Sequence, residues 1–266
     1  MEDFRQRLLN DPEIAKAEAD LQSAAEAMKN ASPNDWNAAK ALRERYEQAE
    51  ERMILLMAGR LAPESPLKSR VVFSNDRRYS ITDAGEGERE MAEDALRSTA
   101  DALVKMVDWS SVDPRDRTLR VALMNIGGAS WYSGEDRKIH MGMMDTPQSR
   151  SILCHEFGHW LEDRVLGADA DTYELSEERS TAPVQGRYMS DRRLWHFRPD
   201  HWPEQYAERV YLSREYDAYP PYTTEVTSVG MEWLMTKPTR LAREDPELFD
   251  HVVTLVGGDL NRRKGA

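Results

Sequence analysis

The spacing of hydrophobic residues divides the chain into helical and strand-like stretches. Between residues 12 and 60, apolar side chains recur at intervals of three and four on a background rich in Ala, Glu, Lys, Arg, Gln and Leu, which is typical of amphipathic helices. Residues 30–35 interrupt this pattern with turn-forming residues. The pattern predicts a hairpin of two helices. Its expected seam consists of Leu21, Ala24, Ala25 and Met28 on one arm and Leu42, Tyr46, Ala49, Met53 and Leu56 on the other.

A second domain is expected after the linker that Pro63 and Pro66 mark. We divide the chain into an accessory or docking hairpin at 1–62 and a larger domain at 68–266. The larger domain should contain a helix over 87–107. Short apolar runs predict strands at 71–73, 79–81, 119–124 and 138–141.

One further helix is predicted over residues 147–166. Thr146 is a suitable N-cap, Pro147 suits a first helical position, and Gly167 lies where a helix would stop.

Composition and charge narrow the classes of function. The net charge is -12 and the two signs are interspersed, which argues against a partner made of nucleic acid or anionic lipid. The single cysteine, Cys154, excludes an intrachain disulfide and a zinc site made of cysteines. No stretch approaches the roughly 20 apolar residues of a membrane span, and the first residues lack the pattern of a secretory signal. We therefore expect a cytoplasmic protein.

The predicted helix over 147–166 carries the motif His155-Glu156-Phe157-Gly158-His159. Residues four apart lie on one face of a helix, so the two imidazoles can converge on one metal ion. Glu156 projects beside them, where it can accept a proton from metal-bound water. The motif therefore predicts a Zn²⁺ site. Gly158, on the opposite face, would permit the close approach of a neighbouring segment.

A catalytic zinc ion takes three protein ligands and leaves one position for water. Residues 160–165 lack the Gly and His of the metzincin continuation, so a carboxylate from another helix is the natural third ligand. The apolar spacing of 223–236 predicts that helix, on which Glu225 and Glu232 share a face. We favour Glu225 as the ligand, with Glu232 as the alternative or as the group that orients a histidine.

Other residues have weaker functional signals. Tyr211 and Tyr222 are candidates to stabilise the oxyanion of a tetrahedral intermediate, with aromatic packing as the alternative. Glu162 could orient a metal ligand or be exposed to solvent. The remaining histidines have no ligand-like spacing and are expected to be structural or exposed; they are His140, His196, His201 and His251.

Three segments resemble a known family. They are HEFGHWLE at 155–162, TEVTSVGMEWL at 224–234 and DPELFDHVVTLVGG at 245–258, joined by a connection that contains Tyr206, Arg209, Tyr211 and Tyr222. Together they resemble the zincin-like metallopeptidases of phage and prophage head-morphogenesis or minor-capsid proteins, over about residues 138–258.

The resemblance implies a gluzincin-type set of ligands, His155, His159 and Glu225, with Glu156 as the base. It implies an α+β fold in which a mixed sheet packs on the motif helix and the C-terminal half is mostly helical. It further implies a role in head maturation or self-processing, in the host cytoplasm or in the virion.

We therefore expect a zinc metallopeptidase that hydrolyses a protein or peptide held along the strand at 138–141, near Ile139, which we expect to be an edge strand of the sheet. The alternative is a non-catalytic, zinc-stabilised assembly or adaptor protein that binds a protein partner through its hairpin. A carboxylate-bridged di-iron site would need Glu-x-x-His on a second helix, and Glu156 to His159 is the single instance in the sequence.

Overall fold

The computed structural model has an α+β fold that is mostly helical, with a small mixed sheet. It describes residues 2–31, 35–63, 70–75, 86–124, 130–142, 148–179, 185–188, 194–197, 202, 205–211 and 223–257. Side chains are not described for residues 75, 86–92, 185–188, 194–197, 205, 208–211 and 223. The strand expected at 79–81 lies outside the described residues.

The mixed sheet has the strand order β1-β2-β4-β3. Three strands are parallel, and the fourth, β3, pairs antiparallel with β4, with Tyr132 opposite Ile139. The strand predicted at 138–141 is therefore an inner strand, and the expectation that it forms the edge is wrong. The strands are β1 (Arg70–Asn75), β2 (Thr118–Met124), β3 (Trp131–Ser133) and β4 (Lys138–Gly142).

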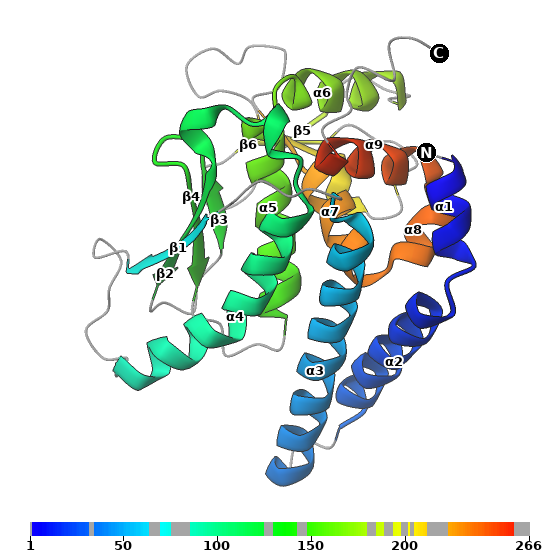
Figure 1. Cartoon of the computed structure of the whole chain (residues 1–266), viewed down its shortest axis with the longest axis vertical. Coiled ribbons are helices and arrows are strands. Elements are labelled where there is room, and N and C mark those ends of the chain that lie inside the picture. Colours follow the sequence, from blue (N-terminus) through cyan, green and yellow to red (C-terminus); the bar gives the residue numbers. More distant parts are fainter. Residues whose placement is uncertain are drawn as a thin grey trace.

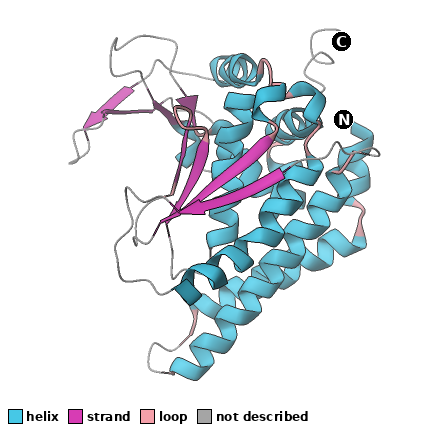
Figure 2. Cartoon of the chain, turned by 60° about the vertical axis from the view of Figure 1, so that its left-hand side comes forward, coloured by secondary structure: helices cyan, strands magenta, loops and turns pink. Residues whose placement is uncertain are grey.

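Helices α4 (Glu86–Met106) and α5 (Ser149–Arg164) pack against this sheet. Apolar residues of β2 and β4 meet apolar residues of both helices in the core, where Val121, Ile139, Leu103 and Phe157 have no exposed surface. Figure 1 shows the sheet on one side of α5 and the N-terminal helices on the other. In the turned view of Figure 2, the strands form a layer beside the helices.

The predicted hairpin is present as α2 (Pro12–Lys29) and α3 (Trp36–Leu61), each begun by an aspartate whose side chain accepts hydrogen bonds from the first turn. A short helix that the sequence did not predict, α1 (Glu2–Leu9), precedes it. Leu21, Ala24 and Met53 of the expected seam are buried, whereas Ala25 is exposed.

The hairpin shares the hydrophobic core of the remaining chain. Helix α3 packs against α4, α5, α7 and α9, and α2 packs against α8. The Glu18 carboxylate on α2 accepts hydrogen bonds from the backbone N–H groups of Thr239 (3.2 Å) and Arg240 (3.3 Å) in the first turn of α8. Whether residues 1–62 form a domain of their own stays a prediction.

After α5, the described residues form four further helices and a second sheet. The helices are α6 (Ala168–Arg179), α7 (Val226–Thr236), α8 (Pro238–Glu244) and α9 (Pro246–Gly257). The second sheet is antiparallel with the order β5-β6-β7-β8, and its strands are Gln185–Tyr188, Leu194–Phe197, Arg209–Tyr211 and Thr223–Thr224. Single 3-10 turns occur at η1 (Trp109–Ser111), η2 (Pro114–Asp116) and η3 (Gln205–Glu208).

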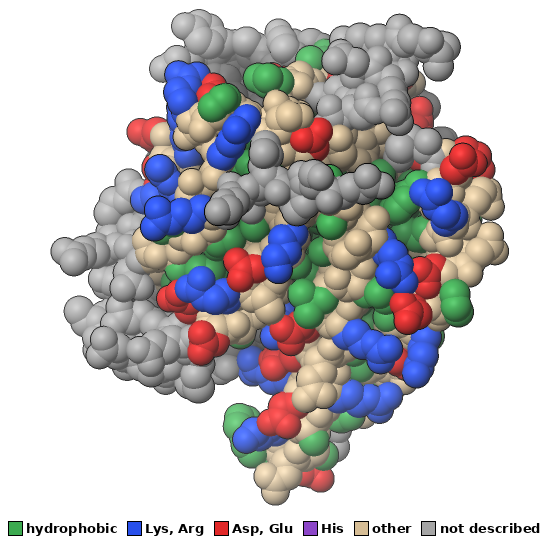
Figure 3. Space-filling model, viewed as in Figure 1, with side chains coloured by type: hydrophobic (Ala, Val, Ile, Leu, Met, Phe, Trp, Pro, Cys, Tyr) green, Lys and Arg blue, Asp and Glu red, His purple; other side chains and the backbone are tan. Residues whose placement is uncertain are grey.

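The surface in Figure 3 carries acidic and basic side chains side by side along the hairpin, as the sequence suggested. None of the helices within the described ranges is both long enough and apolar enough to cross a bilayer.

Candidate metal centre

The motif helix is shorter than the sequence suggested. It begins at Ser149 rather than at residue 147, and its N-cap residue, Gln148, makes no side-chain capping bond. Thr146 and Pro147 lie outside the described residues. The helix ends at Arg164 rather than at residue 166, because Val165 is already extended; Gly167 adopts the left-handed conformation at φ 84° in the turn that follows.

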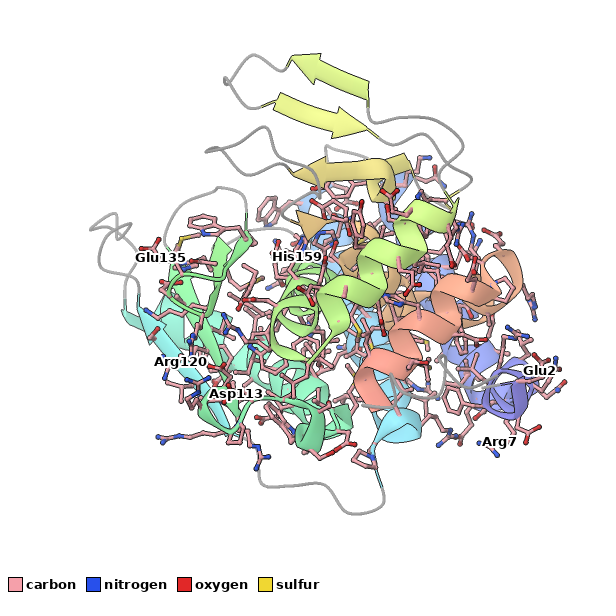
Figure 4. The ribbon with its side chains drawn as sticks, turned by 90° about the horizontal axis from the view of Figure 1, so that it is seen from above. Glu2, Arg7, Asp113, Arg120, Glu135 and His159 are labelled. Carbon is pink, nitrogen blue, oxygen red and sulfur yellow. The ribbon has the colours of Figure 1, made fainter. Side chains whose placement is uncertain are left out.

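The two motif histidines meet one carboxylate. The Nε2 atoms of His155 and His159 each lie 3.1 Å from Oε2 of Glu225, which immediately precedes α7. The two imidazole rings have their centroids 5.3 Å apart. In Figure 4, His159 lies between the mixed sheet and the second sheet. Helices distant in sequence thus bring together three groups that the sequence had marked as metal ligands.

These three residues fit a metal ion. Their donor atoms lie within 4.8 Å of one another, and among the described residues they form the one such cluster of His, Cys, Asp and Glu. Ligands of a tetrahedral zinc ion lie about 3.3 Å from each other. The distances of 3.1 Å between each Nε2 and the shared oxygen are close to that spacing. Two imidazole nitrogens and a carboxylate oxygen are a common donor set for catalytic zinc.

Charge complementarity holds the cluster together. Burial opposes ionisation of Glu225, which is 2% exposed, yet hydrogen bonds from His155 and His159 keep its pKa well below the ordinary value. Burial lowers the pKa of His155, but hydrogen bonds to Glu225 and Glu232 outweigh this effect and raise it to about 10. Ser228 Oγ donates a 2.8 Å hydrogen bond to Glu225 Oε2, which fixes the carboxylate further.

The cluster depends on a close approach of α5 to α7 at Gly158. A Cβ atom placed on Gly158 would lie 2.5 Å from Cα of Ser228 and 2.8 Å from the carbonyl oxygen of Thr227. No other residue type fits without movement of the backbone. The expectation that Gly158 admits a neighbouring segment is confirmed, and that segment is the first turn of α7.

Glu232 lies on the other side of His155. Its Oε2 is 3.4 Å from Nδ1 of that ring, and Glu232 lies about two helical turns after Glu225. A carboxylate on the second nitrogen of a ligating histidine fixes the ring and its tautomer. This placement favours Glu225 as the third ligand and Glu232 as the orienting group.

Glu156 lies between the cluster and the edge of the mixed sheet. Its side chain is buried, and burial raises its pKa, although the charges of His159 and His155 and the backbone N–H of Tyr132 favour the ionised form. Tyr132 belongs to β3, the edge strand. The carboxylate is therefore positioned beside the strand edge to which an extended peptide could pair.

Glu162 is buried rather than exposed. Burial raises its pKa to about 8, although the His159 ring and the backbone N–H of Thr224 favour its ionised form. Of the two alternatives left open by the sequence, exposure is wrong, although a glutamate in the last turns of a helix is usually solvated.

The oxyanion candidates are not placed by the structure. Tyr222 lies outside the described residues, and only the backbone of Tyr211, in β7, is described. Tyr206 in η3 lies closer to the cluster than sequence reasoning anticipated, with its ring centroid 5.7 Å from that of His155. The only feature of the sequence that pointed to Tyr206 as a neighbour of the cluster was its place in the tyrosine-rich connection.

Two other histidines are structural, as predicted. His140 is buried and stacks on Trp131 with ring centroids 4.8 Å apart. His251 is buried, and its Nε2 lies 3.1 Å from Thr172 Oγ1 and 3.2 Å from Thr227 Oγ1. The side chain of His196 and the whole of His201 lie outside the described residues.

Comparisons of the chain with models of protein families, with curated proteins and with solved structures found no match. A functional argument therefore depends on the chemistry of the cluster itself.

Proposed function

We propose that the chain is a zinc-dependent metallopeptidase of the zincin-like class. The observation that carries the proposal is the convergence of His155 Nε2 and His159 Nε2 on one oxygen of Glu225, with a further carboxylate, Glu156, on the same helix. A helix with the His-Glu-x-x-His motif, lying beside a mixed sheet with an antiparallel edge strand, supports the class.

Each residue has a distinct role in this proposal. His155, His159 and Glu225 would hold the ion, and Glu232 would orient the His155 ring. A bound zinc ion would act as a Lewis acid and bring the pKa of its water towards about 7. Glu156 accepts a proton from the attacking water and passes it to the leaving amine. The substrate strand pairs with β3 at Tyr132, in place of the strand at Ile139 that the sequence suggested.

A narrower role in phage or prophage head maturation, or in self-processing, follows from the resemblance of residues 155–162, 224–234 and 245–258 and is part of the same proposal. The substrate class is a protein or peptide segment in an extended conformation.

Zinc binding tests the proposal directly. The purified chain is expected to bind one zinc ion, measured by titration calorimetry and by metal analysis after dialysis. Glu225→Ala should lose the ion on dialysis because a buried ligand is removed, whereas Glu232→Ala should weaken binding by roughly 10- to 100-fold, as is usual for a group that orients a ligand. Glu244→Ala, an exposed helical glutamate paired with Arg240, is the matched control and should bind as the parent does.

Activity completes the test. The zinc-loaded chain should cleave members of a library of quenched fluorescent peptides, and a chelator should abolish cleavage. A metal-bound structure with four protein ligands and no position for water would contradict the proposal and favour the adaptor alternative. Stoichiometric zinc in dialysed Glu225→Ala would move the third-ligand assignment to Glu232.

A further inference from the structure

A buried carboxylate on α3 has no role in the reaction described above. Glu50 has no exposed surface, although the residues that continue its stripe along the helix, Met53, Ile54 and Met57, are all apolar. Transferring a carboxylate into a protein core is costly unless polar partners replace the lost water. The polar neighbours of Glu50 should therefore show which contacts keep a carboxylate at this buried position.

The partners of Glu50 lie on its own helix and on the first turn of α5. Tyr46 Oη donates a 3.3 Å hydrogen bond to Glu50 Oε1. Burial raises the pKa of Glu50 to about 7, while the hydroxyl and backbone N–H of Ser151, the Arg150 guanidinium and the Tyr46 hydroxyl favour its ionised form. Gln148 gives α5 no side-chain cap, and the next residue of α3, Glu51, pairs with the first turn of α5, where Arg150 Nη2 lies 3.6 Å from Glu51 Oε2.

The same group of residues extends to the metal cluster. Burial and the negative charges of Glu50 and Glu232 together raise the pKa of Tyr46, which places the hydroxyl near both carboxylates. Helix α3 also packs against α5 and α7, the helices that carry His155 and Glu232. Since Glu232 Oε2 lies 3.4 Å from Nδ1 of His155, a polar path leads from α3 to a candidate ligand.

We propose that Tyr46 and Glu50 are positioning residues of the metal centre, which hold Glu232 and the first turn of α5 and thereby fix the His155 imidazole. The inference rests on the proposed zinc site. According to this inference, α3, the second arm of the hairpin, helps to position the metal ligands, in addition to any docking role. Outer partners of this kind change metal affinity by roughly 10- to 100-fold.

The test compares Tyr46→Phe and Glu50→Gln with Glu47→Gln in the full chain. Glu47 is the matched control, because it lies one turn earlier on α3 and pairs with Arg43 at 2.8 Å near the surface. Zinc affinity is measured by competition with a chelator, and Co²⁺ is used as a spectroscopic probe of the ligand geometry. We expect Tyr46→Phe and Glu50→Gln to bind zinc about 10-fold more weakly and to shift the visible absorption of bound Co²⁺.

Thermal unfolding of the metal-free chains separates positioning from general damage. Burial raises the folded-state pKa of Glu50 to about 7, above the ordinary value of 4.5. The unfolded chain therefore releases this proton at a lower pH than the folded chain does, and the folded state loses stability as the pH rises from 4.5 to 7. At pH 8, Glu50→Gln removes that cost and should melt at or above the temperature of the parent. A variant that is at least as stable yet binds zinc more weakly distinguishes a positioning role from a purely structural one.

Two outcomes are distinguishable. If the parent binds one ion and both variants match it in zinc affinity and Co²⁺ spectrum, the positioning role is overturned while the zinc site stands. If the parent binds neither metal, the proposed function itself is overturned. Should Glu50→Gln fail to fold, Tyr46→Phe, which retains the ring and removes one hydroxyl, decides the question.

Discussion

Glu156→Gln is expected to retain its zinc ion and to lose peptide hydrolysis by about 100- to 10,000-fold, the usual contribution of a general base. The amide has nearly the shape of the carboxylate and cannot accept a proton at neutral pH. The three proposed ligands are unchanged, so zinc affinity should remain close to that of the parent. Hydrolysis is measured with the quenched peptides and zinc by metal analysis.

The control for this variant is Glu174→Gln on α6, which changes an exposed glutamate in the same way. It should leave both zinc and turnover unaltered. Undiminished turnover in Glu156→Gln would exclude Glu156 as the base, whatever the state of the metal.

Gly158→Ala is expected to lower the free energy of unfolding by about 3 kcal/mol, at the upper end of the usual cost of overpacking a core. The added methyl group would meet backbone atoms of α7, at 2.5 Å from Cα of Ser228 and 2.8 Å from the carbonyl oxygen of Thr227, which cannot move aside as a side chain can. Displacement of α7 would also withdraw Glu225 from the histidines. Urea unfolding and zinc titration measure the two effects.

Other helical glycines calibrate this prediction. A Cβ atom at Gly59 in α3 meets nothing within 4 Å, so Gly59→Ala should stabilise the chain by about 0.5 to 1 kcal/mol through helix propensity. At Gly230 the nearest atoms belong to the side chains of Val252 and Leu248, and the cost should be intermediate. Equal stability of the Gly158 and Gly59 variants would refute the close contact between α5 and α7.

Local signals in the sequence predicted most of the helices. Apolar spacing located α2, α3, α4 and α7 to within a few residues, because each helix buries one face against the others. The His-x-x-x-His spacing and the two glutamates of the later helix predicted which groups meet. Their placement required only that residues four or seven apart share a helix face.

Long-range pairing was not predictable from the same signals. The strands β3 and β7 have three residues each, too few for an alternating pattern to be recognised. The position of β4 inside the sheet depends on β3 pairing beside it, and a single strand does not indicate its neighbours. The expected edge at Ile139 was therefore wrong, and the second sheet was not foreseen.

The roles of the polar residues around the metal cluster were also hard to predict from the sequence. Glu50 lies on the stripe of Tyr46 and Met53, at spacings of four and three, so the sequence did contain a signal in the form of one acidic residue on an apolar face. Its meaning depends on α5, which lies about 100 residues further along the chain. For Glu162 the sequence left an orienting role and exposure open, because its burial depends on contacts with a distant segment that includes the backbone N–H of Thr224.

The contacts from Glu18 to the first turn of α8 join residues 221 and 222 positions apart. During synthesis this cap can close only after Thr239 and Arg240 have left the ribosome, and contacts of such high sequence separation form slowly. The carboxylate of Glu225 emerges at almost the same late stage. A nascent chain therefore cannot bring Glu225 to the motif histidines before the start of α7 has been synthesised, so the proposed hydrolytic activity would begin only after that stage.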